Sequence, residues 1–179
     1  MLQTNEFLPC RNSPARIVVA KRHDTAMVYN MLQSCTKFLS NLGYSHWNGI
    51  HTIQRVDQYI STDSVLMLFD NTLFAGIVVV ALTAPFYHDS SFEECWQSKR
   101  QYGYIGKLCV HPSCHGKGYG EVLLSVAEKS LLENGKSAAR LDINLAVKSL
   151  SGYYTTRGYL EVGTIGTSIL FEKNLLTIV

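Results

Sequence analysis

The sequence predicts one α/β domain with a twisted, mostly antiparallel sheet of six to seven strands and helices on both faces. Three observations support this class. Apolar residues make up 46% of the 179 residues and charged residues 17%, as in a folded globular chain. Hairpin signals dominate the first half. One strand–helix–strand unit lies at the centre, and its helix follows a glycine-rich segment. We expect residues 1–14 to be a poorly structured extension of this single domain, 1–179.

Local signals delimit the elements of the first half. Asp24 is typical of the residue that precedes a helix, and Gly43 is typical of the residue that ends one. The pair Asp70-Asn71 predicts the turn of a β-hairpin. The expected elements are a strand at 16–22, helices at 25–42 and 53–61, and two strands within 64–84.

The second half contains the central strand–helix–strand unit. Residues 85–102 are irregular, polar and aromatic, which indicates a loop or short helix over a site. Gly135 and Gly158 each follow an apolar helical pattern and predict where those helices end. The expected elements are strands at 102–111, 139–146, 159–165 and 167–174, and helices at 119–134 and 149–157.

Composition argues against several classes of function. The net charge is only +2 and the basic residues are scattered, so we expect no nucleic-acid partner. No signal peptide is visible, and the longest apolar run, 77–82, is far too short to cross a membrane. The five cysteines are odd in number and lack CxxC pairs, which favours neither disulfides nor a metal site. We therefore expect a cytoplasmic protein without a membrane partner or a metal.

The stretch LCVHPSCHGKGYGEVLL, residues 108–124, places three glycines between a strand and a helix. The first amide groups of a helix have no partner within it, and the positive end of the helix dipole lies behind them. Glycine allows a bulky anion to approach the backbone closely. This segment is therefore either a simple tight turn or a binding site for phosphate groups.

Two known phosphate-binding loops do not fit this segment. A P-loop needs Ser or Thr after the lysine, but Gly118 follows Lys117. The dinucleotide fingerprint needs glycine at position 121 or 123, which hold Glu121 and Leu123. Asp142 lies at a suitable distance for a ribose-binding acid, but it falls inside a predicted strand. A nucleotide-binding oxidoreductase is thus a weak alternative.

The third type of loop has Arg or Gln, then Gly and a further Gly or Ala, after a strand that ends Val-x-Pro. Here the chain has Val110-His111-Pro112 followed by HGKGYG, residues 115–120. The segment resembles the acetyl-CoA loop of the GNAT superfamily of N-acetyltransferases, of the bacterial type. YYTTRGY, residues 153–159, is similar to the family's Tyr-x-x-x-Gly-(Phe/Tyr) segment, and the order of elements is also similar.

The resemblance implies an enzyme that transfers the acetyl group of acetyl-CoA directly to a primary amine of a small molecule or peptide. It implies that Tyr154 protonates the leaving thiolate. The residues alone would favour simple packing of Tyr154 beside Tyr153, but the family's spacing to Gly158 and Tyr159 favours the catalytic role. It further implies that main-chain groups bind the pantetheine arm and the pyrophosphate. The residues implied are Leu108, Cys109 and Val110 for the arm, and His115, Gly116, Lys117, Gly118, Tyr119 and Gly120 for the pyrophosphate.

The chain departs from the family's pattern at three points. His115 replaces the usual Arg or Gln, and a neutral imidazole offers one donor without a fixed charge. Val147 stands where the family often has an Asn that binds the pantetheine. The family's general base, a Glu in several members, corresponds here to Tyr104. Candidate bases are Tyr104, His111, Asp142 or a water chain, and Asp142 could instead be a structural partner of an arginine.

The acceptor pocket is expected between residues 39–60 and 85–104. Its substrate-binding candidates are Trp47, Tyr87 and Tyr104, with other aromatic side chains of residues 86–96, although each could simply be packed in the core. Acidic residues in the second segment suit a cationic amine. A non-catalytic acyl-CoA sensor with the same fold is the alternative function. The apolar C-terminal strand could support a homodimer.

Overall fold

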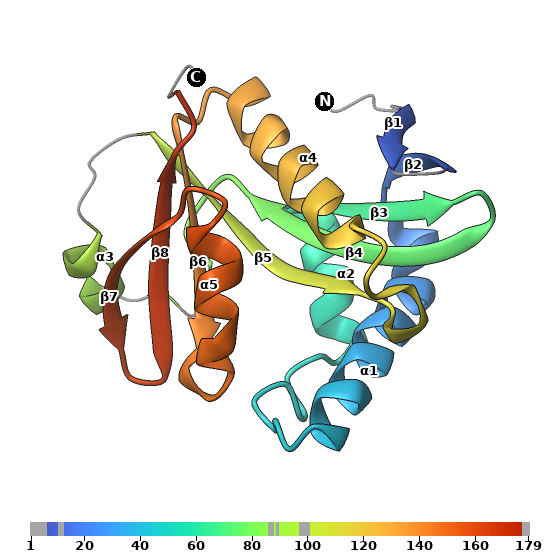
Figure 1. Cartoon of the computed structure of the whole chain (residues 1–179), viewed down its shortest axis with the longest axis horizontal. Coiled ribbons are helices and arrows are strands. Elements are labelled where there is room, and N and C mark those ends of the chain that lie inside the picture. The colour runs from blue at the N-terminus through green and yellow to red at the C-terminus, as the bar shows by residue number, and fades with distance from the viewer. Residues whose placement is uncertain (1–6, 11–12, 86–87, 89, 97–100, 177–179) are drawn as a thin grey trace. The chain divides into compact units, whose positions relative to one another are not determined.

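The computed structural model describes residues 7–10, 13–85, 88, 90–96 and 101–176 (Figure 1). Hydrogen bonds order its strands β1-β2-β3-β4-β5-β6-β8-β7. β5 and β6 are parallel, whereas the other pairs with a described register are antiparallel. The strands are β1 Phe7–Cys10, β2 Ser13–Val19, β3 Ser64–Asp70, β4 Leu73–Ala81, β5 Tyr102–Val110, β6 Ala138–Asn144, β7 Leu160–Ile165 and β8 Ser168–Asn174. This is the mixed, mostly antiparallel α/β sheet that the sequence predicts, with one strand more than expected.

The additional strand is β1, which pairs with β2 within the segment that we expected to be poorly structured. The helices follow the predicted order. They are α1 Thr25–Asn41, α2 Ile53–Thr62, α3 Ser90–Cys95, α4 Tyr119–Glu133 and α5 Ser151–Thr155, with short 3-10 turns at Arg22–Asp24, Pro112–Cys114 and Leu145–Leu150. The last of these turns replaces the end of the strand that we expected to continue to residue 146.

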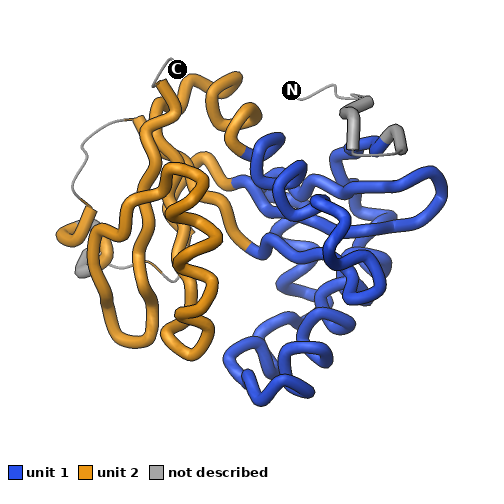
Figure 2. Tube along the Cα trace, in the orientation of Figure 1, with its two compact units in different colours: residues 1–80, 107–127 blue, residues 81–106, 128–179 orange. Residues whose placement is uncertain are grey.

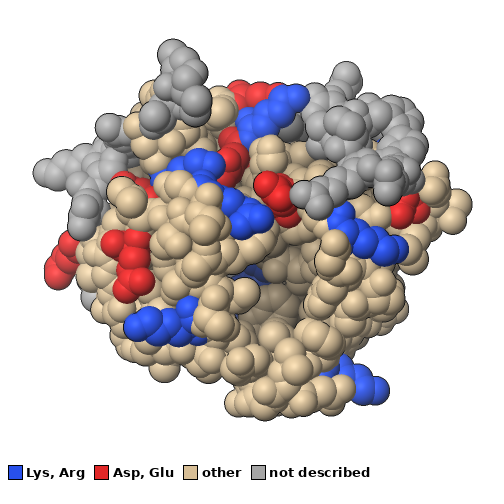
Figure 3. Space-filling model, viewed as in Figure 1, with Lys and Arg blue, Asp and Glu red and all other residues tan. Residues whose placement is uncertain are grey.

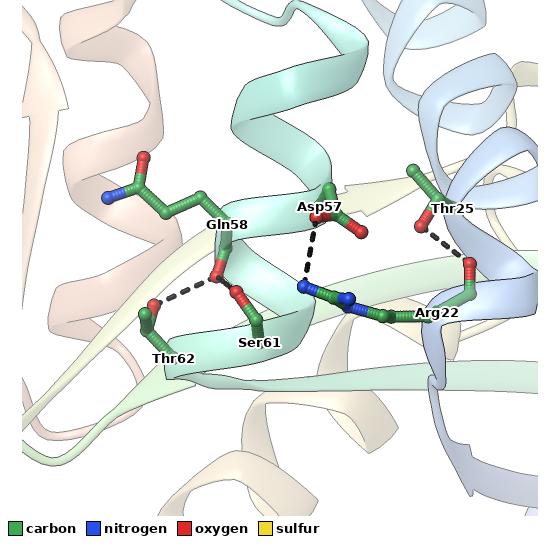
Figure 4. Close-up of polar contacts among 6 residues, drawn as sticks. All are labelled: Arg22, Thr25, Asp57, Gln58, Ser61 and Thr62. Atoms are coloured by element: carbon green, nitrogen blue, oxygen red, sulfur yellow. Dashed lines mark hydrogen bonds and ion pairs between the residues drawn. The ribbon is translucent and has the colours of Figure 1, made fainter.

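Asp24 precedes α1 as predicted, but its side chain does not cap that helix. Its carboxylate accepts the amide of Lys21 at 2.8 Å and so closes the preceding 3-10 turn. Figure 4 shows how this turn meets α2: the Arg22 guanidinium lies 3.6 Å from the Asp57 carboxylate. In the last turn of α2 the hydroxyls of Ser61 and Thr62 donate to the carbonyl of Gln58.

The chain divides into two compact units, coloured separately in Figure 2. Unit 1 comprises residues 1–80 and 107–127. Its helices α1 and α2 cover one face of the strands, where Met31, Leu32 and Val56 pack with Met67 and Ile77. The opposite face meets α4. A Cβ on Gly76 would lie 3.0 Å from the Leu123 side chain and 2.6 Å from the Cys109 carbonyl, so only glycine fits there.

Unit 2 comprises residues 81–106 and 128–179. On one face of its strands, Phe92 and Trp96 pack with Tyr104 and Leu170. The other face meets α4, because a Cβ on Gly103 would overlap the Leu131 side chain. An ion pair of 2.7 Å between Lys173 of β8 and Glu128 of α4 adds to this contact. Helices thus cover both faces within each unit.

Candidate active site

The glycine-rich loop of unit 1 has the backbone that the sequence predicts for an anion site. Gly116 and Gly118 adopt φ of +77° and +83°, a region that other residues rarely adopt. A Cβ at either position would have no heavy atom within 4 Å, so the space beside the backbone is open. The loop can therefore receive a bulky group against its main chain.

The start of α4 supplies the donors of this loop. The first bond of its helical ladder runs from the Val122 amide to the Gly118 carbonyl, at 3.2 Å. The amides of Gly118, Tyr119 and Gly120 precede that bond, so the helical ladder does not use them. With the helix dipole behind them, these amides form a site suited to a pyrophosphate. Lys117 is exposed on the same loop.

The side chain of Tyr119 holds the glycine-rich loop in position. Its ring is buried, and its hydroxyl donates to the Asp70 carboxylate at 2.5 Å. Asp70 ends β3, so this bond holds the first turn of α4 to the β3–β4 hairpin. A charge-assisted bond of this kind is stronger than one between neutral groups. The position of the loop therefore depends on a side chain as well as on its glycines.

His115, the unexpected residue of the loop, is bound to the neighbouring strand. Its Nε2 lies 2.9 Å from the carbonyl oxygen of Val110, and a carbonyl can only accept, so Nε2 donates. The ring also meets Phe38 of α1 edge-on, with the centroids 5.0 Å apart. The imidazole thus ties the loop to the end of β5, a role that its replacement of Arg or Gln did not suggest.

The end of β5 is partly buried against α1. Cys109 lies in the core of unit 1, and its thiol shares a hydrogen bond with Cys35, whose Sγ also donates to the Val110 carbonyl at 3.5 Å. This hydrogen bond, together with burial, raises the pKa of Cys109 well above its usual value. Since the thiolate is the nucleophile, Cys109 is poorly suited to form an acyl-enzyme.

Tyr154, in α5 of unit 2, is buried among aromatic rings. Its ring contacts Tyr153, Tyr159 and Phe171, with centroids 5.1 to 5.9 Å apart. Burial, followed by the charges of Tyr153 and Asp142, raises the pKa of Tyr154 above its ordinary value. The hydroxyl therefore stays protonated near neutral pH. It is also a weaker acid than the ordinary phenol assumed from the sequence.

Asp142, on β6 of the same unit, has two described contacts. The Ser168 hydroxyl donates to its Oδ2 at 3.0 Å, and the Nε2 of His88 lies 3.7 Å from its Oδ1. The His88 side chain is fully buried and stacks on Phe92, while 21% of the Asp142 side chain is exposed. Because Asp142 also acts on the pKa of Tyr154, the two groups lie within electrostatic range of each other.

The other candidate residues have structural contacts. Tyr104 is buried edge-on to His88, with centroids 5.1 Å apart, and near Trp96. In unit 1, Nδ1 of His111 accepts the amide of Ser113 and so caps the turn after β5. Trp47 packs against the unit 1 core, and Tyr87 lies outside the described residues. Val147 is buried, and its apolar side chain has no donor or acceptor to offer a ligand.

Arg140 lies between the rings of Trp96 and Tyr102, at 4.6 and 3.4 Å from their centroids, and pairs with Glu172 at 3.0 Å. It is 1% exposed, so we assign it to the packing of unit 2. Two features of unit 1 were not predicted from the sequence. They are the burial of His51 and the left-handed backbone of Lys107, with φ +51°. No local motif marks them, because each depends on its neighbours in space.

Charges do not gather into one patch on the face shown in Figure 3, where Lys and Arg side chains of the described residues alternate with Asp and Glu. None of the described helices is long and apolar enough to cross a bilayer. Within the described part of the chain, no three His, Cys, Asp or Glu side chains gather in a way that could hold a metal ion.

The model of the GNAT family of acetyltransferases matches residues 30–159. The chain belongs to this family. The match covers the glycine loop, α4 and Tyr154, and so confirms the family that the loop motif indicated. No curated protein matches the sequence significantly.

Solved structures with the same fold extend over nearly the whole chain. A GNAT-family acetyltransferase from Listeria monocytogenes is 16% identical, has a TM-score of 0.78, and the match covers 93% of this chain and 98% of that one. The PaiA N-acetyltransferase from Thermoplasma acidophilum, solved with coenzyme A, is 16% identical with a TM-score of 0.70, over 89% and 98% of the two chains. An acetyltransferase from Thermus thermophilus is 13% identical with a TM-score of 0.67, over 93% and 99%. At these identities the likeness shows the fold.

Proposed function

We propose that this GNAT chain transfers the acetyl group of acetyl-CoA directly to a primary amine of a small molecule or peptide. The observation that carries the proposal is the loop of residues 115–120, with two left-handed glycines and open space at the start of α4. A pyrophosphate fits such a loop. The family match and the coenzyme A bound by the Thermoplasma relative support the same ligand.

The loop amides would hold the pyrophosphate, and the main chain of Leu108, Cys109 and Val110 would bind the pantetheine arm. Acetyl-CoA supplies the activated thioester. Main-chain amides of β5 would stabilise the charge that develops on its carbonyl oxygen. The raised pKa of Cys109 argues against an acyl intermediate on this cysteine.

In the transfer the amine nitrogen bonds to the acetyl carbon, the carbon–sulfur bond breaks, and the nitrogen loses a proton. Among the candidate bases we propose Asp142, whose side chain is partly exposed and held by Ser168. A nitrogen bonded to the acetyl carbon is far more acidic than the free ammonium, so a carboxylate can accept its proton. Tyr154, which is protonated near neutral pH, would give the thiolate its proton.

The proposal is tested by ligand-dependent stabilisation together with product analysis. We expect coenzyme A and acetyl-CoA, but not NAD, to raise the melting temperature through binding to the folded state. Mass spectrometry should then detect an N-acetylated product from a panel of primary amines. Stabilisation by NAD alone would contradict the proposal. Binding of coenzyme A without any acetylated amine would instead favour the acyl-CoA sensor.

A further inference from the structure

His51 of unit 1 is a buried imidazole with no described partner for its ring. The residue is 3% exposed, and both ring nitrogens lack a hydrogen-bond partner among the described residues. Its backbone is held, because Gln33 donates to the His51 carbonyl at 2.9 Å. A buried polar group without a partner is unfavourable for the folded state. Both ring nitrogens are buried, and a molecule that reached them after neighbouring side chains moved would meet no competing partner among the described residues.

The charges around His51 are positive. Burial, then Lys107 and then Arg55, lower the pKa of His51 to about 4, so the ring is neutral at physiological pH. Burial and Lys107 also lower the pKa of His46. Trp47 lies between these histidines in the sequence and meets the rings of both edge-on, with centroids 6.2 and 4.9 Å away. We call His46, Trp47, His51 and Lys107 the His51 cluster.

Lys107 has a second unusual property. Its φ of +51° is the left-handed conformation, which is unfavourable for a residue other than glycine. It lies in β5 directly before Leu108, the first residue of the segment proposed to bind the pantetheine arm. Strained backbone of this kind is concentrated at binding and catalytic sites.

We propose that the His51 cluster binds a carboxylate of the acceptor, so that the preferred substrates are amines that also carry a carboxylate, such as amino acids. This inference rests on the proposed acetyltransferase function. A neutral imidazole donates one N–H to a carboxylate oxygen, and Lys107 and Arg55 supply favourable charge. The same charges would repel a second ammonium group of the acceptor.

Matched acceptor pairs test the inference: L-phenylalanine with 2-phenylethylamine, L-lysine with cadaverine, and γ-aminobutyrate with butylamine. We expect wild type to prefer the carboxylate-bearing member of at least one pair by about tenfold or more in kcat/KM, as for a charged hydrogen bond. His51→Gln and Lys107→Gln should reduce this ratio towards one. Lys37→Gln, at an exposed lysine of α1, should leave it unchanged. Equal use of both members of every pair, or an unaltered ratio in both variants, would overturn the inference.

Coenzyme A affinity separates this inference from the proposed function. Coenzyme A is itself an anion, so its dissociation constant is measured for each variant. We expect wild-type affinity in His51→Gln, and a loss of affinity there would assign the cluster to the cofactor and overturn the inference. If wild type binds no coenzyme A or acetylates no amine, the proposed function itself has failed.

A thermal readout distinguishes a ligand-binding His51 from a structural one. Replacing a buried polar group that lacks a partner with an apolar one of similar size relieves an unfavourable burial. We therefore expect His51→Leu to raise the melting temperature of the free protein while it abolishes the preference for carboxylates. A lower melting temperature in both His51→Leu and His51→Gln would show that the ring is a structural element and contradict the inference.

Discussion

The two compact units differ in the kind of atom on which their proposed roles depend. In unit 1 the proposed phosphate site consists of main-chain amides, shaped by Gly116 and Gly118 and held by Tyr119. In unit 2 the proposed chemistry depends on the side chains of Tyr154 and Asp142, whose properties come from their surroundings. Binding through the backbone can survive changes of side chain, such as His115 in place of Arg or Gln. Catalysis through single side chains should not survive their loss.

The largest effect is expected in unit 2. Tyr154→Phe removes the proposed acid and keeps the ring contacts, so kcat should fall by about 100-fold or more. The dissociation constant of coenzyme A should stay the same. Tyr153→Phe, which removes the adjacent hydroxyl, is the matched control and should retain most activity. Steady-state kinetics and calorimetry measure both quantities, and an unchanged kcat in Tyr154→Phe would remove the assignment of the acid.

The units should also respond to opposite ends of the pH scale. The pKa of His51 is about 4 in the folded protein, whereas the ordinary value for histidine is 6.5, so the unfolded chain gains this proton before the folded chain as the pH falls between them. The folded state should lose about 3 kcal/mol by pH 4 relative to its stability above pH 6.5. Urea unfolding across this range should show a shallower acid dependence for His51→Gln. An identical slope in the two proteins would contradict the burial of a neutral ring.

The raised pKa of Tyr154 in unit 2 acts in the other direction. The folded state holds this proton more tightly, so its stability falls only as the pH rises above the ordinary tyrosine value of about 10.

A change in the loop backbone should weaken cofactor binding by about tenfold. Gly118→Ala forces a residue with a Cβ into a φ of +83°, at a cost of about 1–2 kcal/mol, and places a methyl group in the open space beside the loop. Gly43→Ala is the matched control, because Gly43 has φ +88° and equally open surroundings at the end of α1. Both variants should lose stability, but only Gly118→Ala should bind coenzyme A more weakly. Equal affinities would place the ligand elsewhere.

Loss of the hydrogen bond between Tyr119 and Asp70 should have a smaller effect. Tyr119→Phe removes the hydrogen bond to the Asp70 carboxylate and should lower the free energy of unfolding by about 1–2 kcal/mol. Tyr44→Phe, at a more exposed tyrosine of unit 1, provides a control. Chemical denaturation checks the comparison. If Tyr119→Phe is as stable as wild type, Tyr119 is not the residue that holds the loop.

The smallest effect is expected at His115. His115→Ala loses the bond to the Val110 carbonyl and should weaken coenzyme A binding only about threefold, because the main-chain amides remain. His115→Gln retains an N–H donor and should bind more tightly than His115→Ala. Calorimetric titration measures the dissociation constant of coenzyme A for both variants. A much larger loss in both would mean that the imidazole itself contacts the phosphates.

Local signals predicted most of the fold. Gly43 and Gly135 follow α1 and α4 as expected, both with left-handed φ, and Asn71 with φ +54° makes the predicted hairpin turn. The exception is β1, whose sequence carries no strong strand pattern and whose order comes from pairing with β2. A strand defined by its partner cannot be recognised from its own residues.

The candidate site also has a part that could be predicted from the sequence and a part that could not. The loop of residues 115–120 was readable because its amides and glycines are consecutive. The pairing of His88 with Asp142 and the influence of Lys107 on His51 each join residues far apart in the sequence. No spacing rule relates such residues, so their pairing and their pKa shifts appear only in the folded chain.

The central claim, direct transfer to an amine, is tested most directly by a single-turnover reaction with acetyl-CoA that carries a radiolabelled acetyl group. Excess wild-type protein is mixed with the labelled thioester and an amine acceptor, and the mixture is quenched in acid. We predict that label moves from the thioester to the amine at the rate of coenzyme A release, without passing through the protein. Label trapped on a cysteine, or coenzyme A binding without transfer to any amine, would contradict it.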